Sequence, residues 1–475
     1  MKHTKSIGPK AIIAGGRRLR ALVLLGALAG SGAAMAQSST APAASSDESL
    51  TWHGITLYGI VDLGLQYQTH GAPISDYFPA GSADIVQKNS NGSIFGVTPN
   101  NLSQSRIGLQ GVEPIVDDWS AVFKLETFFN PQSGDISDAL KSLVQNNGRS
   151  ATEQTTNLDS SVAGQIFQQS FVGVSSKTVG TFTFGRQNTV LADGIAKYDP
   201  NAASQAFALI GLSGTTAGGG DTQDRRLDDS LKYVATFADI VHFGALYKFN
   251  QATGAARTAY QVDIGAEFAG ASVDAYYSKV NDAISASALS AGDVADLPKL
   301  GFSPSNSLAG TVSDNTAFAI MALYKIQTLK FFAAYEHIQY ANPSDPLAVT
   351  AGFDDLGGYK LAFVNTAAYP NDKILEVYWA GAKYTVIPDL DLTVAYYGYH
   401  QNAYGTLADA GCTGNTSGTC SGTEDDLSFD ADYRLTKRFD AYGGVMYSGV
   451  KNGLAAGYDL HTTDITTTFG LRYKF

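Results

Sequence analysis

The chain ends in Asp464–Phe475 (DITTTFGLRYKF), a stretch in which two kinds of side chain alternate without interruption. One parity carries Ile465, Thr467, Phe469, Leu471, Tyr473 and Phe475, and the other carries Asp464, Thr466, Thr468, Gly470, Arg472 and Lys474. This period of two predicts a β-strand with one apolar and one polar face. A strand that stops at Phe475 leaves an unpaired edge unless another strand covers it. The fold is therefore decided by the partner of this edge and by the solvent that each face meets.

The same alternation recurs outward from this stretch, first in Thr56–Gln68, Ser105–Glu113 and Trp119–Phe129. Long polar links alternate along the chain with tight ones, which predicts about sixteen strands of roughly ten residues each. The long links are His70–Asn101, Asn130–Gln165, Asn188–Arg225, Asp282–Asp314, Asn342–Lys373, Asn402–Glu424 and Lys451–Thr463, with a shorter one at Gln251–Thr258. The tight links are Pro114–Asp118, Ser176–Gly180, Ala238–Ile240, Gly270–Ala271, Gln327–Thr328, Pro388–Asp389 and Thr436–Lys437.

This rhythm favours an all-β transmembrane antiparallel barrel with short periplasmic turns and long extracellular loops. A closed barrel satisfies every backbone group within the protein, and closure pairs the last strand with Thr56–Gln68. About sixteen strands enclose a lumen that side chains cannot fill, so the lumen is wet and the apolar face meets lipid. On this basis Leu471 and Tyr473 should face lipid, and Arg472 and Asp464 should face pore water.

The first residues predict export. Residues 1–36 combine a basic start, a short apolar core and the cleavage pattern Ala34-Met35-Ala36, which is typical of a cleaved signal peptide. Residues 37–53 form a flexible Ala/Ser-rich leader, and residues 54–475 form the barrel. Cleavage removes six of the 32 Lys and Arg and none of the 44 Asp and Glu, so the mature formal charge becomes −18. A charge of this sign argues against nucleic acid as a partner.

Five stretches together resemble one family, the proteobacterial trimeric porins of the Burkholderia and Neisseria type. They are Leu57–Asp62 (LYGIVD), Ser105–Gly111 (SRIGLQG), Phe123–Glu126 (FKLE), Phe171–Gln187 with its FVGV and GTFTFGRQ segments, and Ala431–Arg438 (ADYRLTKR). The terminal Phe475 completes the resemblance. It implies a homotrimer in the outer membrane that admits ions and small hydrophilic solutes by passive diffusion, without a cofactor.

The resemblance also implies a constriction made by the third long loop, 188–225, folded into the barrel. Acidic residues of this loop should face basic residues of the wall, and their opposed charges would set a field across the pore. The predicted constriction residues are Arg106, Lys124, Glu126, Arg186, Asp193 and Asp199. Strict alternation would aim Arg186 at lipid together with Phe182 and Phe184, so we expect a bulge near Gly185 that turns it inward. The ion preference stays open, because the charge of −18 favours cations and the wall arginines favour anions.

Other features complete the sequence-based predictions. Cys412 and Cys420 flank a short loop, and export favours a disulfide between them. Phe475 resembles the signal that the outer-membrane assembly machinery reads in this family. Lipid and lipopolysaccharide are expected to surround the barrel. We expect no catalytic or metal-binding residues.

Three alternatives remain open. A substrate-selective porin for sugars or organic anions could use a track of inward tyrosines, namely Tyr58, Tyr378, Tyr397 and Tyr399. An outer-membrane hydrolase barrel would need Ser and His, yet the sequence has no GxSxG elbow. In an adhesin or receptor, the long loops would carry the function.

Overall fold

A computed structural model describes most of the chain, namely residues 50–77, 90, 92–156, 164–209, 225–249, 258–344, 353–406, 411–458 and 460–475. The expected signal peptide and nearly all of the expected leader lie outside these ranges, so both stay predictions. Within the described residues, no helix is long and apolar enough to cross a membrane.

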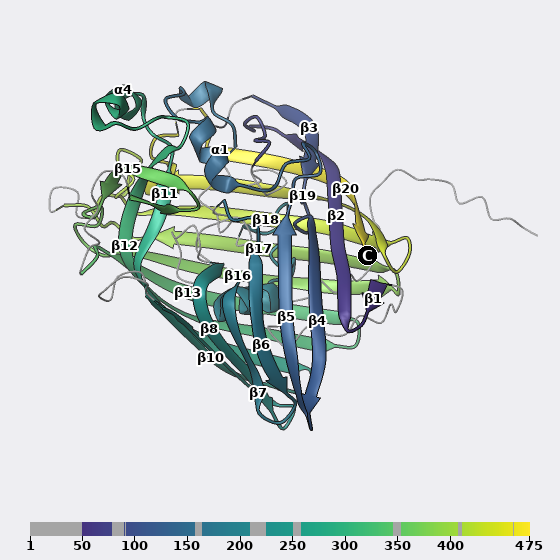
Figure 1. Cartoon of the computed structure of the whole chain (residues 1–475). Coiled ribbons are helices and arrows are strands. Elements are labelled where there is room, and N and C mark those ends of the chain that lie inside the picture. The colour runs from purple at the N-terminus through teal and green to yellow at the C-terminus, as the bar shows by residue number, and fades with distance from the viewer. Residues whose placement is uncertain are drawn as a thin grey trace, which may run out of the picture.

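One sheet contains all 20 described strands (Figure 1). Four of them are short additions near strand ends: β1 (Thr51–Trp52), β3 (Ile94–Pro99), β14 (Phe353–Leu356) and β15 (Tyr359–Asn365). The other 16 pair antiparallel in chain order and close into a barrel through β2 and β20. They are β2 (Ile55–Gln68), β4 (Arg106–Val116), β5 (Trp119–Phe128), β6 (Gln169–Ser176), β7 (Gly180–Asn188), β8 (Arg226–Phe237), β9 (Val241–Lys248), β10 (Ala259–Phe268), β11 (Ala271–Ser287), β12 (Ser307–Ile326), β13 (Leu329–Ala341), β16 (Lys373–Ile387), β17 (Leu390–Gln401), β18 (Gly422–Arg434), β19 (Phe439–Asn452) and β20 (Thr463–Lys474).

The terminal strand β20 pairs with β2, as the sequence predicts. The register places Val61 opposite Tyr473 and Gly64 opposite Gly470. Beyond β20, the backbone N–H groups of Phe475 and Gly59 each donate to the other residue's carbonyl oxygen at 3.0 Å. The last residue of the chain therefore contributes directly to barrel closure.

The two faces of β20 meet different surroundings. Outward side chains such as Phe469 and Leu471 are 57% and 49% exposed, whereas inward Thr468 is fully buried. The exposed apolar side chains form the face that meets lipid, in agreement with the predicted orientation of the barrel wall.

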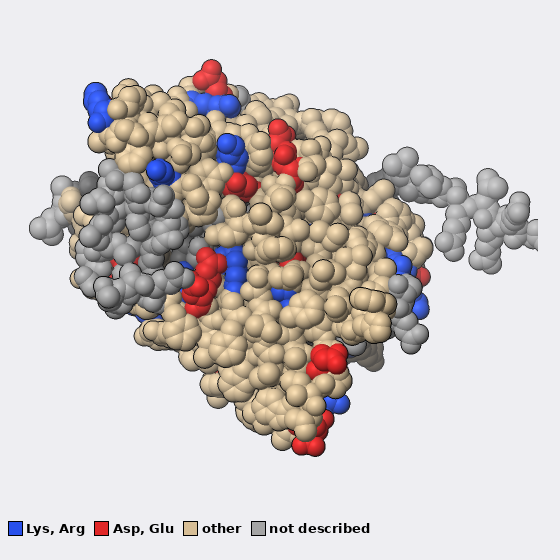
Figure 2. All heavy atoms as spheres, in the orientation of Figure 1, with Lys and Arg blue, Asp and Glu red and all other residues tan. Residues whose placement is uncertain are grey.

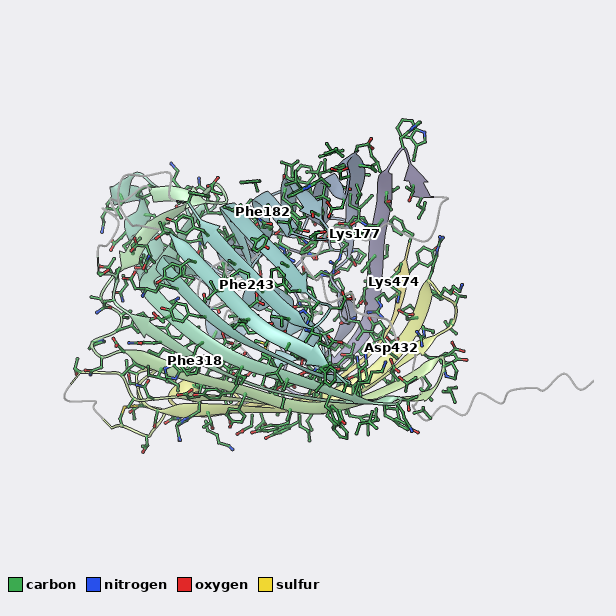
Figure 3. All side chains as sticks on the ribbon, turned by 90° about the horizontal axis from the view of Figure 1, so that it is seen from below. Lys177, Phe182, Phe243, Phe318, Asp432 and Lys474 are labelled. Carbon is green, nitrogen blue, oxygen red and sulfur yellow. A yellow bond between two sulfur atoms is a disulfide. The ribbon has the colours of Figure 1, made fainter. Side chains whose placement is uncertain are left out.

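Arg472 lies inside the barrel but does not stand free in pore water. Its guanidinium contacts Asp440 at 2.7 Å and Asp432 at 3.0 Å, and it donates to Ser103 at 2.9 Å. Asp432 and Lys474 are labelled near each other in Figure 3, and Lys474 also contacts Asp440 at 2.7 Å. This network joins β18, β19 and β20 to the segment that precedes β4, and so stabilises the seam where the barrel closes. Asp464 is likewise buried rather than in pore water, and accepts from the Thr69 hydroxyl at 2.8 Å.

Short turns and long loops occupy opposite ends of the barrel. Figure 1 shows α1 (Ala139–Gln145) and α4 (Ala291–Leu300) at the loop end. Two expected links are partly regular structure: β11 and β12 extend well into 282–314, and β14 and β15 lie within 342–373. The sequence predicts links at those residues because they are polar. Strands can continue beyond the membrane, where polar side chains are exposed to water on both faces.

The extracellular loops pack on one another across the mouth. Asp138 caps the N-terminus of α1 and accepts a hydrogen bond from the Tyr359 hydroxyl at 2.7 Å. At the other end of α1, Asn147 accepts from the Leu289 backbone N–H at 2.7 Å and donates to the Ser307 carbonyl at 2.8 Å. The loop after β5 is thereby fixed to loops that lie far away in the sequence.

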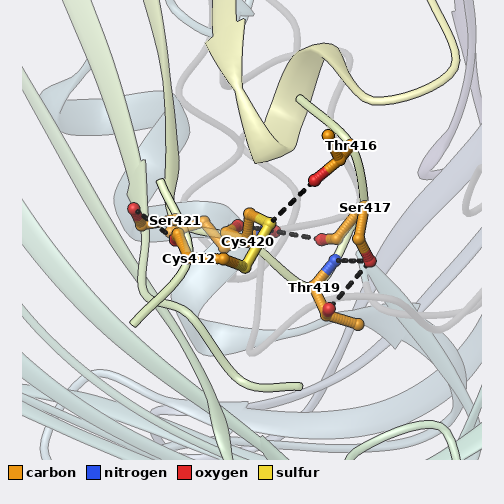
Figure 4. The surroundings of a disulfide bond; sticks show 8 residues. Cys412, Thr416, Ser417, Thr419, Cys420 and Ser421 are labelled. Atoms are coloured by element: carbon orange, nitrogen blue, oxygen red, sulfur yellow. Dashed lines mark hydrogen bonds between the residues drawn. A yellow bond between two sulfur atoms is a disulfide. The ribbon is translucent and has the colours of Figure 1, made fainter. Parts of the chain in front are cut away.

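The predicted disulfide is formed. Cys412 and Cys420 are joined with their Cα atoms 4.8 Å apart, in the loop between β17 and β18 (Figure 4). The Ser421 backbone N–H donates to the Cys412 carbonyl at 3.0 Å, which holds the base of the loop closed.

Candidate functional site

The loop after β7 folds along the inside of the barrel, as expected for 188–225. It begins with α2 (Val190–Tyr198), whose N-terminus is capped by the Thr189 hydroxyl. The apolar side of α2 buries Leu191 and Ile195 in one cluster with Met321 of β12. This packing holds the helix against the inner wall.

Beyond α2, the loop continues around the inner wall through specific hydrogen bonds. Trp379 of β16 donates to the Tyr198 carbonyl at 3.0 Å, and Asn201 donates to the Ser428 hydroxyl of β18 at 3.1 Å. The backbone N–H groups of Gln205 and Ala206 both donate to the Asn101 carbonyl at 2.9 Å. The segment from 190 to 209 therefore lies over the wall from β8, where Val190 packs with Leu227, to β19, where Phe207 packs with Tyr442.

Basic side chains gather on the inner wall of β4 to β8, where Lys124, Arg186 and Arg226 are only 8%, 7% and 6% exposed. Arg106 of β4 and Lys124 of β5 lie 3.7 Å and 3.4 Å from Glu126 Oε2. Arg186 of β7 contacts Asp228 of β8 at 2.6 Å. Arg226 of β8 lies in the same group, because its guanidinium and that of Arg106 are 4.7 Å and 5.3 Å from the Phe128 ring.

Glu126 forms the centre of this basic wall. Its side chain is fully buried and accepts from the Tyr58 hydroxyl at 2.8 Å and from the Gln169 amide at 3.0 Å. The carboxylate therefore has fixed partners on β2 and β6 as well as the cations beside it. It holds Arg106 and Lys124 at defined positions on the wall.

Arg186 is turned inward by an irregularity at the predicted position. The register between β7 and β8 shifts between Gly185 and Gln187, so that Arg186 stands opposite both Asp228 and Asp229. Gly185 has φ +130°, and a Cβ there would lie 2.2 Å from the Ser170 carbonyl oxygen. Phe184 is 52% exposed and Arg186 only 7% exposed, so the two residues no longer share a face.

Of the two loop acids, Asp193 faces a basic residue of the wall and Asp199 does not. Asp193 contacts Lys232 of β8 at 2.5 Å and accepts from the Asn188 amide at 3.1 Å, at the base of the loop. Asp199 is 2% exposed and accepts from the Tyr397 hydroxyl and the Ala203 backbone N–H, both at 2.6 Å. Burial raises the pKa of Asp199 from 3.8 to about 6, against the opposing effect of those hydrogen bonds. Asp199 therefore has its partners within the docked loop and on β17, whereas Asp193 is paired with a cation of the wall.

Sequence reasoning missed Arg226, Phe128 and Lys232. Arg226 follows Arg225 at the end of the loop, where the irregular register of β8 hides the inward parity. Lys232 shares parity with Ser230, which points inward, so a closer reading of β8 could have found it. Phe128 carries no sequence signal of its role as a ring that contacts two guanidinium groups.

The predicted tyrosine track is not assembled. Tyr378 points outward and is 38% exposed, so the expected inward orientation is wrong. Tyr397 is 1% exposed beneath the loop, while Tyr58 lies across the barrel beside Glu126. The strand parity of β16 explains the difference, because Leu375, Val377 and Trp379 occupy its inward positions.

A closed 16-strand barrel with an apolar outer face and an inward-folded loop defines a transmembrane barrel of the outer-membrane type. The model of the Gram-negative porin family matches residues 21–453, and the chain belongs to this family. Its place is accordingly the outer membrane of a Gram-negative cell.

Individual relatives agree with this assignment. An outer membrane porin protein of Bordetella pertussis is 30% identical over 197 residues, which span 41% of this chain and 43% of that relative. An anion-selective porin from Comamonas acidovorans superposes with a TM-score of 0.57 at 16% identity, covering 89% of this chain and 99% of its own. The trimer form of OmpT from Vibrio cholerae superposes with a TM-score of 0.54 at 14% identity, with the same coverage of 89% and 99%. At 16% and 14% identity, these two solved structures support the fold alone.

Proposed function

We propose that this protein is a homotrimeric channel through which small hydrophilic solutes diffuse passively, and that its constriction favours anions. The observation that carries the proposal is the basic wall on β4, β5, β7 and β8, opposite the inward-folded loop. A solute that passes between them meets side chains fixed by Glu126, Asp228 and Phe128.

The local charge supports the anion preference. Arg106, Lys124, Arg186 and Arg226 face two carboxylates, Glu126 and Asp228, so the group carries a formal charge of about +2 when all six are ionised. The carboxylates beside α2 are matched by lysines, since Asp193 contacts Lys232 at 2.5 Å and Asp274 of β11 contacts Lys197 at 3.1 Å. The narrow part therefore differs in sign from the chain as a whole, and ion selectivity follows the charge at the narrow part.

The sign of selectivity is measured by the reversal potential of the purified protein in a planar bilayer with a salt gradient. The native protein should prefer anions. Arg106→Ala combined with Arg186→Ala should lower the anion-to-cation permeability ratio several-fold, because two of the four cations are lost.

A matched control removes two cations from the turn end, as Lys177→Ala with Lys437→Ala, and should keep the native ratio. Retention of the folded barrel is checked by the electrophoretic migration of the unheated protein. A cation-selective native channel, or an unchanged ratio in the double arginine variant, would contradict the proposed constriction.

No structural observation favours the hydrolase alternative. His337 and His400 lie at outward positions of β13 and β17. The rings of His70 and His461 stack on each other with centroids 3.8 Å apart. In the described residues, no three His, Cys, Asp or Glu side chains are grouped in a way that could hold a metal ion.

A further inference from the structure

One acidic side chain of the inner wall, Glu336 of β13, is shut off from the water of the lumen. It lies on the inward face of the strand, between Ala334 and Ile338 of the same face, and its exposed fraction is 0%. The wall of a 16-strand barrel leaves inward side chains open to a wet lumen. The cover over Glu336 is therefore the inward-folded loop.

The loop covers this part of the wall with α2, which packs on β12 and β13. Leu191 and Ile195 of α2 belong to the same buried cluster as Ala319 and Val377. Those two wall residues are the register partners of Glu336 on β12 and β16. The carboxyl group of Glu336 thus lies between the wall and the docked helix.

The surroundings of Glu336 are apolar. Both of its carboxyl oxygens lack a hydrogen-bond partner among the described residues. The buried side chains around it are Ala317, Ala319 and Met321 on β12, Leu375, Val377 and Trp379 on β16, and Leu191 and Ile195 on α2. On the face of the molecule shown in Figure 2, by contrast, acidic side chains lie at the surface. An ionised carboxylate at the position of Glu336 would lose its hydration without gaining a partner, whereas the uncharged acid loses much less.

No described charged group compensates Glu336. Each titratable side chain of α2, and Asp199 directly after it, already has a partner elsewhere. The pairs are Asp193 with Lys232, Lys197 with Asp274, Tyr198 with Ser272 and Asp199 with Tyr397.

The lysines that share the inward faces of the three strands lie farther along the barrel. Lys373 is four residues from the level of Glu336, about 14 Å at the rise of a strand, and its ammonium lies 5.1 Å from the Tyr340 ring. Lys325, Lys330 and Lys383 are each six residues away, or about 20 Å, toward the turn end.

We propose that the protonation state of Glu336 controls the docking of the inward loop. As the uncharged acid it fits beneath α2, and once ionised it draws water to the wall and displaces α2 into the lumen. Docking therefore retains a proton that the undocked state releases, so docking is strongest at low pH and weakens as the pH rises. A displaced loop occupies part of the lumen and lowers the current, whatever the sign of ion selectivity.

The test follows the exposure of the loop with a single engineered thiol. Ala208, a loop residue of the same cluster with an exposed fraction of 0%, is replaced by Cys in the full-length protein. The chain's two own cysteines are joined in a disulfide and do not react. The rate of labelling by a charged thiol reagent is measured at pH 6 and pH 9.5, with Glu336 and with Glu336→Gln. The intrinsic reactivity of the thiol rises equally in both backgrounds, so the ratio of the two rates reports docking.

The two rates should be equal at pH 6. At pH 9.5 the background with Glu336 should label at least about tenfold faster, because a proton-linked equilibrium changes up to tenfold per pH unit. Single-channel currents at pH 9.5 should fall in steps in the native protein and stay steady in Glu336→Gln.

Glu336→Leu, which suits the apolar surroundings, should behave as Glu336→Gln does, so that a poorly folding glutamine variant does not decide the test. The matched control is Glu376→Gln on β16, where the native side chain points outward and contacts His337 at 2.9 Å; it should keep the native dependence on pH. The same dependence of labelling on pH in the native background and in both Glu336 variants would overturn the proposal. Labelling does not depend on ion selectivity, so this outcome is distinct from a failure of the proposed anion preference.

Discussion

At the scale of single residues, the constriction depends on side chains whose partners lie in other elements. Glu126 of β5 is bound from β2 and β6, and Phe128 of β5 contacts arginines of β4 and β8. The loop is held in a similar way, since Tyr397 of β17 donates to Asp199. Each contact joins positions in different elements of the chain, so no local sequence pattern predicts it.

Asp199 makes the docking of the inward loop depend on pH. Its pKa of about 6 in the folded protein exceeds the ordinary 3.8, so the folded state retains a proton that the unfolded state releases. This contribution to stability is complete below pH 3.8 and is lost as the pH rises through 6. We expect Asp199→Asn to lack this dependence, because its amide is uncharged. The amide oxygen can accept from the Ala203 N–H while the NH2 group donates to the Tyr397 hydroxyl, whose partner in the native protein is the other carboxylate oxygen.

The measurement is denaturant unfolding in detergent at pH 5 and pH 7.5. Between these values the native protein should lose about 1.4 kcal/mol more of its free energy of unfolding than Asp199→Asn does. Other buried acids titrate in both proteins, so the difference between them isolates Asp199. Equal losses in the two proteins would show that the Asp199 carboxylate is not held in an apolar setting.

At the scale of elements, the strands were predictable because alternation has a direct physical cause. One face meets lipid and the other meets the lumen, so each strand repeats with a period of two, and β20 and β2 were recognised in this way. Loop structure was not predictable to the same degree. The position of α2 follows from Tyr198 meeting Trp379 and from Leu191 and Ile195 meeting the far wall. Of the two acids assigned to the pore, Asp199 is buried where the loop docks on β17, and Asp193 contacts Lys232 of β8.

The irregularity at Gly185 is the element-scale feature that orients Arg186. Gly185→Ala should destabilise the barrel by about 1–3 kcal/mol, because a residue with a Cβ is strained at this backbone conformation. The Cβ would also press on the Ser170 carbonyl, 2.2 Å away, and displace Arg186. We therefore expect a lower anion-to-cation permeability ratio, in the same direction as for Arg186→Ala.

The control for this substitution is Gly96→Ala in β3, where the nearest heavy atom to the new Cβ would be Ile74 Cδ1 at 3.9 Å. Unfolding midpoint and reversal potential are measured for both variants. A native permeability ratio in Gly185→Ala would mean that Arg186 reaches the lumen without help from the irregular register.

At the scale of the whole molecule, the outer surface divides into an apolar side and a side with ionisable groups. The apolar side, β2 to β7, is continuous with the seam formed by β20 and includes β3, whose Phe95 is 69% exposed. A face of this kind, apolar apart from a few outward residues such as Thr127 and, near the turn end, Glu113, suits contact with other copies of the chain. The expected homotrimer would accordingly assemble through β2 to β7.

Two arginine substitutions at matched positions test this arrangement. Val172 of β6 and Ile264 of β10 lie mid-strand and are 60% and 61% exposed. An arginine that faces lipid near the bilayer midplane lowers the stability of a barrel by about 2–4 kcal/mol, so both variants should lose comparable stability. Only Val172→Arg would also bury an unpaired charge between subunits, which is more costly because no water or headgroup can reach it. Light scattering of the purified proteins should find monomers for Val172→Arg and trimers for Ile264→Arg. Trimers in both cases would place the subunit contact elsewhere on the barrel.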